Sequence, residues 1–252
     1  MSNYPSQPTA PQSWVGLRRY TAARIAIGRV GAGLPLKAHL EFQAAHARAR
    51  DAVQASLHVD AFTAALAACD WPVRTVRSAA PNRQVFLRQP TLGRLLAAES
   101  KAELSEPMVA PDVVIVIGDG LSSVAVERHA IPVLKGLWPR LQDRGYRLGP
   151  IVVATQARVA LADQIGEVLQ AKLSVMMIGE RPGLSAADSL GLYLTYEPRI
   201  GRVDSERNCI SNVRDGGMNP EQAAAAALDL IKSMFAHRAS GVCLSVNRIG
   251  EN

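Results

Sequence analysis

The sequence predicts an α/β protein built on a parallel, doubly wound sheet, preceded by a mainly helical region. From about residue 109 onward, short apolar runs alternate with helical patterns, as in chains that place helices on both faces of a parallel sheet. Before that point the apolar residues recur mainly at helical spacing. A chain of 252 residues can bury a substantial core around such a sheet.

The first part of the chain divides into a tail and a helical region. Residues 1–13 are polar and proline-containing, and we predict a disordered tail there. Residues 14–108 form the mainly helical region. Helices are expected over residues 36–57, 61–68 and 92–104. The first of them has an apolar face made by Phe42, His46, Ala49 and Val53. Short strands at residues 73–76 and 84–88 are expected to pair with each other.

The second part, residues 109–252, holds the predicted sheet. Strands are expected over residues 112–117, 151–154, 173–178 and 190–196. The β-branched run ending at Ile117 is typical of a strand buried on both faces. Pro132 is suited to begin a second helix after the first strand. Asn219 followed by Pro220 predicts the start of the last helix.

Composition argues against several classes of function. The net charge is +6, but the arginines are scattered and aromatic residues are only 5%, which disfavours a nucleic-acid surface. The three cysteines form no CxxC pair, so neither a zinc knuckle nor a redox motif is indicated. No secretory leader or bilayer-length apolar run occurs, so we expect a soluble intracellular protein. No complete catalytic or metal-ligating motif is found, and neither kind of site is predicted.

Two polar segments that follow predicted strands are the best candidates for a site. They span residues 179–185 and 205–214, and in a parallel sheet both would lie at the edge where ligands bind. Glu180 could accept hydrogen bonds from an amide-rich ligand, or belong to an ordinary exposed turn. Cys209 lacks a motif that supplies a base, so we interpret it as a binding or packing residue instead of a nucleophile.

A third candidate is the glycine-containing turn at residues 118–123. It reads G-x-G-x-x-S, one residue short of the dinucleotide fingerprint, and opens a predicted helix. This pattern keeps a nicotinamide- or flavin-dependent oxidoreductase domain as an alternative function of the chain. The acidic residue expected after the second strand is missing, since Ala154, Thr155 and Gln156 stand there. A tight strand-to-helix turn capped by a serine explains the same pattern.

Several longer motifs resemble one family, the small (light) subunit of ethanolamine ammonia-lyase. The resemblance covers residues 17–241 and includes the stretches at 21–29 and 45–53 in the first part. In the second part it rests on the motifs at residues 119–122, 158–159, 163–167, 179–184 and 209–212. Their number and their order along the chain make the resemblance specific.

The resemblance implies a Rossmann-like domain over residues 109–252 that helps to bind adenosylcobalamin. Members of the family assemble with a large TIM-barrel subunit into an enzyme that converts ethanolamine to acetaldehyde and ammonia by a radical route. The cofactor-binding positions of the family correspond here to Val159, Glu180 and Cys209. No D-x-H-x-x-G motif occurs, which agrees with base-on binding, in which the cofactor keeps its own benzimidazole on cobalt.

The same resemblance bears on activity and location. A small subunit of this kind is expected to be a partner-dependent ammonia-lyase subunit of a hetero-oligomer, inactive alone, with no membrane or nucleic-acid partner. Many members carry a longer N-terminal extension associated with packaging into a bacterial microcompartment. This chain has only a short tail, so the plain cytoplasm and a microcompartment are both kept as locations.

Overall fold

The structure is a computed structural model that describes residues 12–106 and 108–244. Within those residues the centre of the molecule is one six-stranded sheet with the strand order β1-β3-β2-β4-β5-β6. The strands are β1 (Val73–Arg77), β2 (Val113–Gly118), β3 (Leu148–Thr155), β4 (Leu173–Gly179), β5 (Leu190–Tyr196) and β6 (Asn208–Val213). The predicted α/β class is confirmed. Most of the predicted tail, residues 1–11, lies outside the described residues, and a helix begins at Gln12.

The sheet is mixed, and the prediction of a parallel sheet holds only for its first four strands. β1, β3, β2 and β4 pair in parallel, whereas β5 is antiparallel to β4 and β6 is antiparallel to β5. The connection from β4 to β5 spans only residues 180–189. A parallel crossover needs a dozen or more residues, so this short connection turns the chain back on itself.

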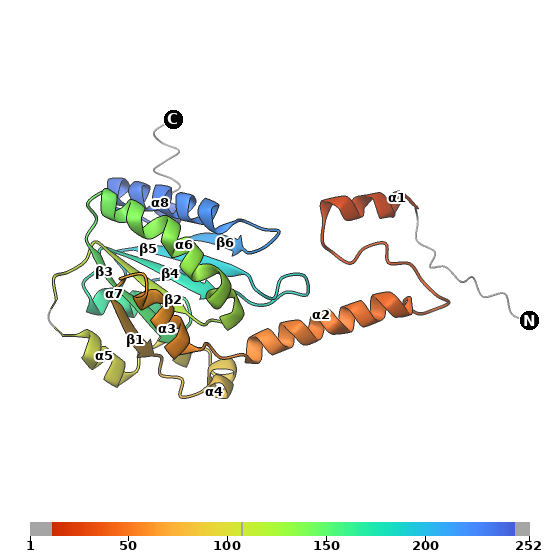
Figure 1. Cartoon of the computed structure of the whole chain (residues 1–252), viewed down its shortest axis with the longest axis horizontal. Helices are drawn as coiled ribbons and strands as arrows, with labels where there is room; N and C mark the ends of the chain where they lie inside the picture. The colour runs from red at the N-terminus through yellow and green to blue at the C-terminus, as the bar shows by residue number, and fades with distance from the viewer. Residues whose placement is uncertain (1–11, 107, 245–252) are drawn as a thin grey trace, which may run out of the picture.

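Helices cover both faces of the sheet (Figure 1). The α-helices are α1 (Gln12–Val15), α2 (Leu36–Gln54), α3 (Val59–Ala67), α4 (Arg83–Arg88), α5 (Ala98–Leu104), α6 (Ser123–Asp143), α7 (Leu161–Val168) and α8 (Pro220–His237). Short 3₁₀ helices are η1 (Gly16–Tyr20), η2 (Leu92–Arg94) and η3 (Asp204–Glu206). The larger apolar core lies between the sheet and α3, α6 and α8, and the smaller core lies under α5 and α7.

Two of the predicted elements before the sheet are wrong. Residues 84–88 form helix α4 instead of a strand, because Asn82 caps the turn by accepting a hydrogen bond from the Val85 amide, 3.0 Å away. β1 therefore pairs with β3 and forms the edge of the main sheet. The predicted helix at 92–104 is broken into η2 and α5, since Leu96 pairs with Ser78 as an isolated bridge.

Pro132 does not begin a new helix, contrary to the prediction. It lies inside α6, as does Pro139, and the helix continues through both. A proline within a helix removes one backbone hydrogen bond, which normally destabilises it. The buried face of α6, which includes Ala130, Val133 and Leu137, packs on the sheet and offsets that loss.

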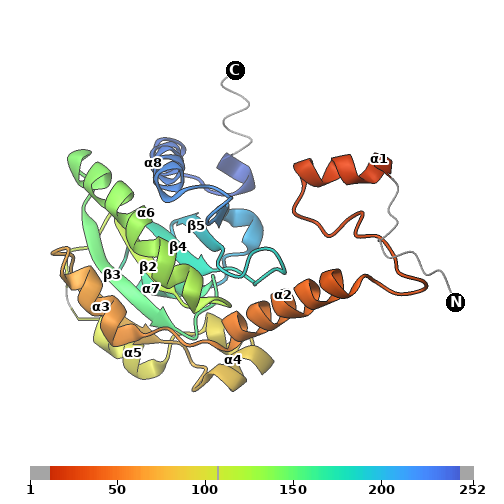
Figure 2. The same cartoon turned by 45° about the vertical axis from the view of Figure 1, so that its right-hand side comes forward.

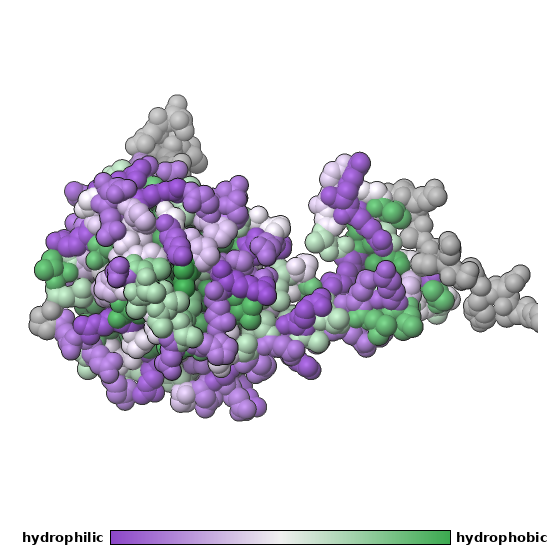
Figure 3. All heavy atoms as spheres, in the orientation of Figure 1, coloured by the Kyte–Doolittle hydropathy of each residue, from purple (hydrophilic) through white to green (hydrophobic). Residues whose placement is uncertain are grey.

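Residues 12–54, up to the end of α2, form an arm that extends away from the sheet (Figure 1). Figures 1 and 2 show α2 projecting from the body of the protein, with α1 drawn above the outer part of α2. The buried residues of α2 are Ala45 and Ala52, so its predicted apolar stripe stays largely uncovered. Apolar residues on the arm are visible at the surface in Figure 3, and Tyr20 and Leu36 are each 71% exposed. The predicted division of the chain at residue 108 stays a prediction.

Candidate functional site

The second polar segment that follows a predicted strand is itself mostly strand. Residues 208–213 form β6, so the prediction of a loop there is wrong. The premise that both segments follow parallel strands is also wrong, because Tyr196 at the end of β5 pairs with Leu173 at the start of β4. β6 nevertheless runs back to the carboxyl edge of the parallel strands. The Asn212 amide near its end donates to Oε2 of Glu180, 3.2 Å away.

Glu180 ties β4, β5 and β6 together at that edge. Its Oε2 accepts a hydrogen bond from the Ser189 hydroxyl at 2.6 Å as well as the bond from Asn212. Its Oε1 lies over Gly191, where an added Cβ would come within 2.9 Å of that oxygen. Among the described residues Oε1 has no hydrogen-bond partner, so one acceptor atom of a half-buried carboxylate remains free for a ligand. Glu180 is therefore not part of a simple exposed turn.

Cys209 lies on the edge strand β6, opposite Tyr193 of β5. The side chains of Tyr193 and Cys209 are close enough to influence each other's pKa. Partial desolvation of the thiol raises the pKa of Cys209, the nearby Glu180 adds to the rise, and Tyr193 opposes it. A thiol whose pKa is raised stays protonated at neutral pH and is a poor nucleophile. The geometry therefore agrees with a packing or binding role for Cys209.

Val159 lies in the loop between β3 and α7, on the same side of the sheet. It packs against the smaller core, as Tyr193 does. Its carbonyl accepts a hydrogen bond from the Ala162 amide at 3.2 Å, but its own amide has no partner among the described residues. Val159 therefore offers a partly exposed backbone donor beside an apolar side chain.

This side of the sheet is only partly covered by helices. α5 and α7 pack against β1, β2 and β4, whereas the principal helix contacts of β5 and β6 are with α6 and α8 on the opposite face. Register places Tyr193 beside Met176 of the smaller core, and Cys209 beside Tyr193. The side chains over β5 and β6 thus continue the face of the smaller core beyond the edge of α7.

The glycine-containing turn after β2 is filled by the protein itself. The buried Asp119 carboxylate accepts hydrogen bonds from the Gln156 and Ala157 amides, at 3.0 and 2.9 Å. Gly120 has φ +56°, and an added Cβ would lie 2.2 Å from the Gly179 carbonyl. The Leu121 amide donates to that same carbonyl. A pyrophosphate needs free amides and open space, so this turn does not favour a dinucleotide site.

Ser122 caps helix α6 at this turn, and its replacement tests the structural interpretation. Its hydroxyl accepts from the Ala125 amide at 3.3 Å and donates to the Ala187 carbonyl at 2.7 Å. We expect Ser122→Ala to lower the free energy of unfolding by about 1–2 kcal/mol in urea titrations, because a cap and a buried hydrogen bond are lost. The exposed Ser185→Ala is the control.

Addition of NAD or FAD to the wild-type protein should leave its Tm unchanged, and a nucleotide-dependent rise in Tm would favour the oxidoreductase alternative.

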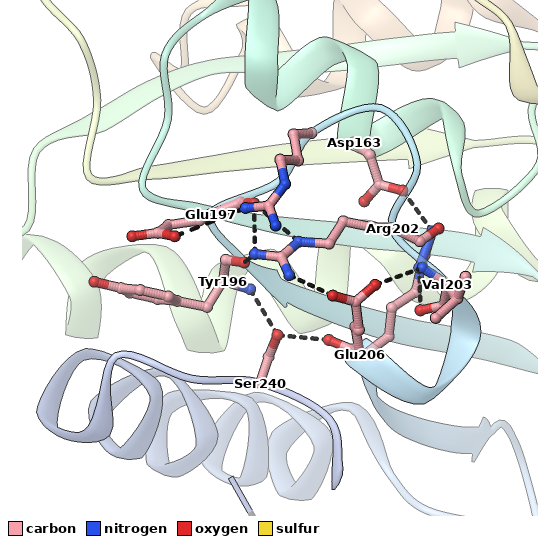
Figure 4. Close-up of polar contacts among 9 residues, drawn as sticks. Asp163, Tyr196, Glu197, Arg202, Val203, Glu206 and Ser240 are labelled. Carbon is pink, nitrogen blue, oxygen red and sulfur yellow. Dashed lines mark hydrogen bonds and ion pairs between the residues drawn. The ribbon is translucent and has the colours of Figure 1, made fainter. Parts of the chain in front are cut away.

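A polar network at the other edge of the sheet fixes the segment that leads into β6 (Figure 4). Arg202 donates to the Tyr196 carbonyl at 3.1 Å and forms an ion pair with Glu206. Ser240 accepts from the Tyr196 amide at 3.0 Å and donates to the Glu206 carbonyl. These contacts join the end of β5, η3 and the segment after α8, and so hold the start of β6 in place.

Arg207 and Asp163 form a buried ion pair in the same region, and each side chain is only 3% exposed. Arg207 also donates to the Val203 carbonyl at 2.8 Å and the Arg202 carbonyl at 3.1 Å. Burial raises the pKa of Asp163 to about 6, although the Arg207 charge opposes the rise. This pair connects α7 to the residue directly before β6.

Sequence reasoning missed the arginines beside the site. Arg158, which precedes Val159, stacks over Phe86, and so does Arg83. These residues are far apart in the sequence, so spacing carried no signal for their proximity.

Within residues 12–106 and 108–244 no group of three or more His, Cys, Asp and Glu residues is arranged to hold a metal ion. None of the helices in that part of the chain has both the length and the apolar character required to cross a bilayer.

The family model and the curated relatives that match this chain all point to one protein family. A family model described as ethanolamine ammonia-lyase light chain (EutC) matches residues 11–245. The chain is 48% identical over 239 residues to the ethanolamine ammonia-lyase small subunit of Azotobacter vinelandii, covering 93% of this chain and 88% of the relative. It is 47% identical over 235 residues to the small subunit of Pseudomonas syringae pv. tomato, covering 92% and 82%. For Xanthomonas campestris pv. campestris the identity is 43% over 245 residues, covering 95% and 90%.

Proposed function

Because the chain belongs to the family of ethanolamine ammonia-lyase light chains, we propose that it is the small subunit of an adenosylcobalamin-dependent ethanolamine ammonia-lyase. The enzyme would convert ethanolamine to acetaldehyde and ammonia, and cobalamin would supply the radical chemistry. The large subunit, a TIM barrel, would hold the substrate. This chain would bind part of the cofactor at the interface and would be inactive alone. The observation that carries the proposal is the family match over residues 11–245.

The groups available near Val159, Glu180 and Cys209 fit the periphery of cobalamin. Its corrin ring is surrounded by amide side chains, which need both donors and acceptors. The free Val159 amide is a donor, and the free Oε1 of Glu180 is an acceptor. The exposed Cys209 would pack against the ligand at the edge of the sheet. We propose these three residues as the contribution of this chain to cofactor binding.

We also propose that cobalamin binds base-on, with its own benzimidazole kept on cobalt. Among the described residues, no histidine lines the cavity beside Val159. His39 and His46 lie on α2 and His129 lies on α6, against the larger core.

We retain a Rossmann-like description for residues 109–252 and a cytoplasmic or microcompartment location as parts of the proposal.

The exposed apolar arm supports the assignment of a partner subunit. Trp14, Tyr20, Leu36 and Leu40 are each more than half exposed within one segment of the chain. Exposed apolar patches of this kind commonly mark protein interfaces. We propose that the arm contacts the large subunit, so that the complete cofactor site exists only in the hetero-oligomer.

Reconstitution tests the proposed function. The purified chain alone should not deaminate ethanolamine. Mixed with a matching large subunit and adenosylcobalamin, it should restore the release of acetaldehyde and ammonia. Cobalamin binding is followed separately by visible absorption, and the large subunit without this chain is the control. Absence of both cofactor binding and turnover in the mixture would contradict the proposal.

A further inference from the structure

Four arginines gather beside two of the proposed cofactor-binding residues. The arginine cluster consists of Arg83, Arg94, Arg158 and Arg181. Two of them are sequence neighbours of the proposed residues, since Arg158 directly precedes Val159 and Arg181 directly follows Glu180. Burial lowers the pKa of Arg158, and the positive charges of the other three arginines lower it further. Asp119 is the acidic residue that opposes this effect. An arginine remains protonated despite such shifts, so the cluster carries an excess of positive charge.

Asp119 does not neutralise the whole cluster. It lies 3.5 Å from Arg83 and is also bonded to the amides of Gln156 and Ala157. Arg83 in turn donates to the Val53 and Gly120 carbonyls, at 2.8 Å each. Arg83 and Asp119 are therefore bonded mainly to each other and to backbone groups. Among the described residues, Arg94, Arg158 and Arg181 have no ion pair at all.

Arg158 packs against Phe86 and Gly93 although it has no ion-pair partner among the described residues. Its guanidinium carbon lies 4.4 Å from the centre of the Phe86 ring, and its amide donates to the Gly93 carbonyl at 2.8 Å. Gly93 makes room for it, since a Cβ there would come within 2.9 Å of the Arg158 Cγ. The Nε of Arg158 is buried and has no hydrogen-bond partner within the described residues. A buried donor without a partner is costly, which favours an acceptor supplied from outside the chain.

Arg158 and Val159, one of the three proposed cofactor-binding residues, line the same cavity of about 310 Å³. Its lining includes Arg94, Arg158 and Val159, together with Arg202 and Arg207. The last two are already paired with Glu206 and Asp163. Asp204 also lines the cavity and has no ion pair among the described residues, so Arg94 and Arg158 together leave an excess of positive charge there. Arginine side chains bind phosphate groups well because their planar forks match phosphate oxygens.

We propose that Arg158, with Arg94, binds the phosphodiester in the nucleotide tail of cobalamin. The inference rests on the proposed function and extends it from the amide rim of the cofactor to its tail. The phosphodiester is the anionic group that cobalamin offers, and none of the three proposed contact residues supplies a positively charged donor for it. The position of Arg158 next to Val159 would bring the tail towards β3 and α7 while the corrin amides meet Glu180.

The test compares two cofactors on the complete two-subunit complex. Adenosylcobinamide lacks the nucleotide tail with its phosphodiester, whereas adenosylcobalamin carries it. We expect Arg158→Gln to weaken adenosylcobalamin binding about ten- to a hundredfold, as for a lost charge-assisted hydrogen bond, and to leave adenosylcobinamide affinity unchanged. Affinities are measured by visible absorption titration. The exposed Arg94→Gln should show a smaller loss with the same selectivity, and Arg238→Gln, at the end of α8, is the matched control.

Each outcome decides for or against the inference. If Arg158→Gln and Arg94→Gln weaken the two ligands equally, or not at all, the phosphodiester assignment is overturned while the proposed function stands. If the variants reduce association of the subunits but not cofactor affinity in the assembled complex, the arginines bind carboxylates of the partner instead. If the wild-type complex binds no adenosylcobalamin, the proposed function itself fails. Circular dichroism melts identify any misfolded variant, in which case Arg94→Gln decides.

Discussion

Replacement of Glu180 by alanine is expected to weaken adenosylcobalamin binding to the two-subunit complex about ten- to a hundredfold. The substitution removes the free Oε1 that we assign to a corrin amide. It also removes the acceptor that holds the Ser189 hydroxyl and the Asn212 amide, so the edge where β4, β5 and β6 meet loses its common link. The dissociation constant from visible absorption titration measures the effect.

Two further variants separate the causes of that loss. Glu180→Gln keeps an acceptor oxygen of the same reach and is expected to retain much of the affinity. Glu197→Ala removes an exposed carboxylate at the opposite edge of the sheet and should bind cobalamin like the wild type. Wild-type affinity in Glu180→Ala would exclude Glu180 as a cofactor contact. An equal loss in Glu197→Ala would assign the effect to subunit assembly.

The central strands could be predicted because a continuous run of apolar residues indicates a strand that is buried on both faces. β2, β3 and β4 read as apolar runs, and the structure buries nearly every residue in them. The direction of β5 could not be predicted in the same way, since an apolar run looks alike in either orientation. Only the length of the 180–189 connection carried that information. Helix α4 was missed because its capping contact with Asn82 matters more than the apolar residues within it.

The candidate site was predictable where its residues follow a strand and unpredictable where they converge from afar. Glu180 could be identified from its place directly after an apolar run. The arginine cluster could not, because Arg83 and Arg158 meet only through Phe86, over which both guanidinium groups stack. The near-match to a dinucleotide fingerprint left two interpretations open, because a packed turn and a phosphate-binding turn need glycine for the same conformational reason. The bonds of Asp119 to the Gln156 and Ala157 amides and the position of Gly179 against Gly120 separate the two.

Replacement of Arg207 by methionine is expected to lower the free energy of unfolding by about 3–5 kcal/mol at pH 8. The variant leaves Asp163 as a buried carboxylate without its counter-ion. It also removes the hydrogen bonds to the Val203 and Arg202 carbonyls that hold the segment before β6. The exposed Arg199→Met, in the same segment, should cost less than about 0.5 kcal/mol. Urea titrations of both variants against the wild type measure the difference.

The cost of Arg207→Met should fall as the pH is lowered from 8 to 5. Burial already raises the pKa of Asp163 to about 6 in the presence of Arg207, and loss of that positive charge raises it further. A raised carboxyl pKa means that the folded state binds a proton before the unfolded chain does. The contribution of Asp163 to stability is therefore fully present below its ordinary pKa and lost as the pH rises through the folded value. At pH 5 the carboxyl in the variant is neutral, and the buried-charge part of the cost disappears. A cost that stays the same at pH 5 and pH 8 would mean that the hydrogen bonds to the backbone, and not the charge of Asp163, determine the contribution of Arg207.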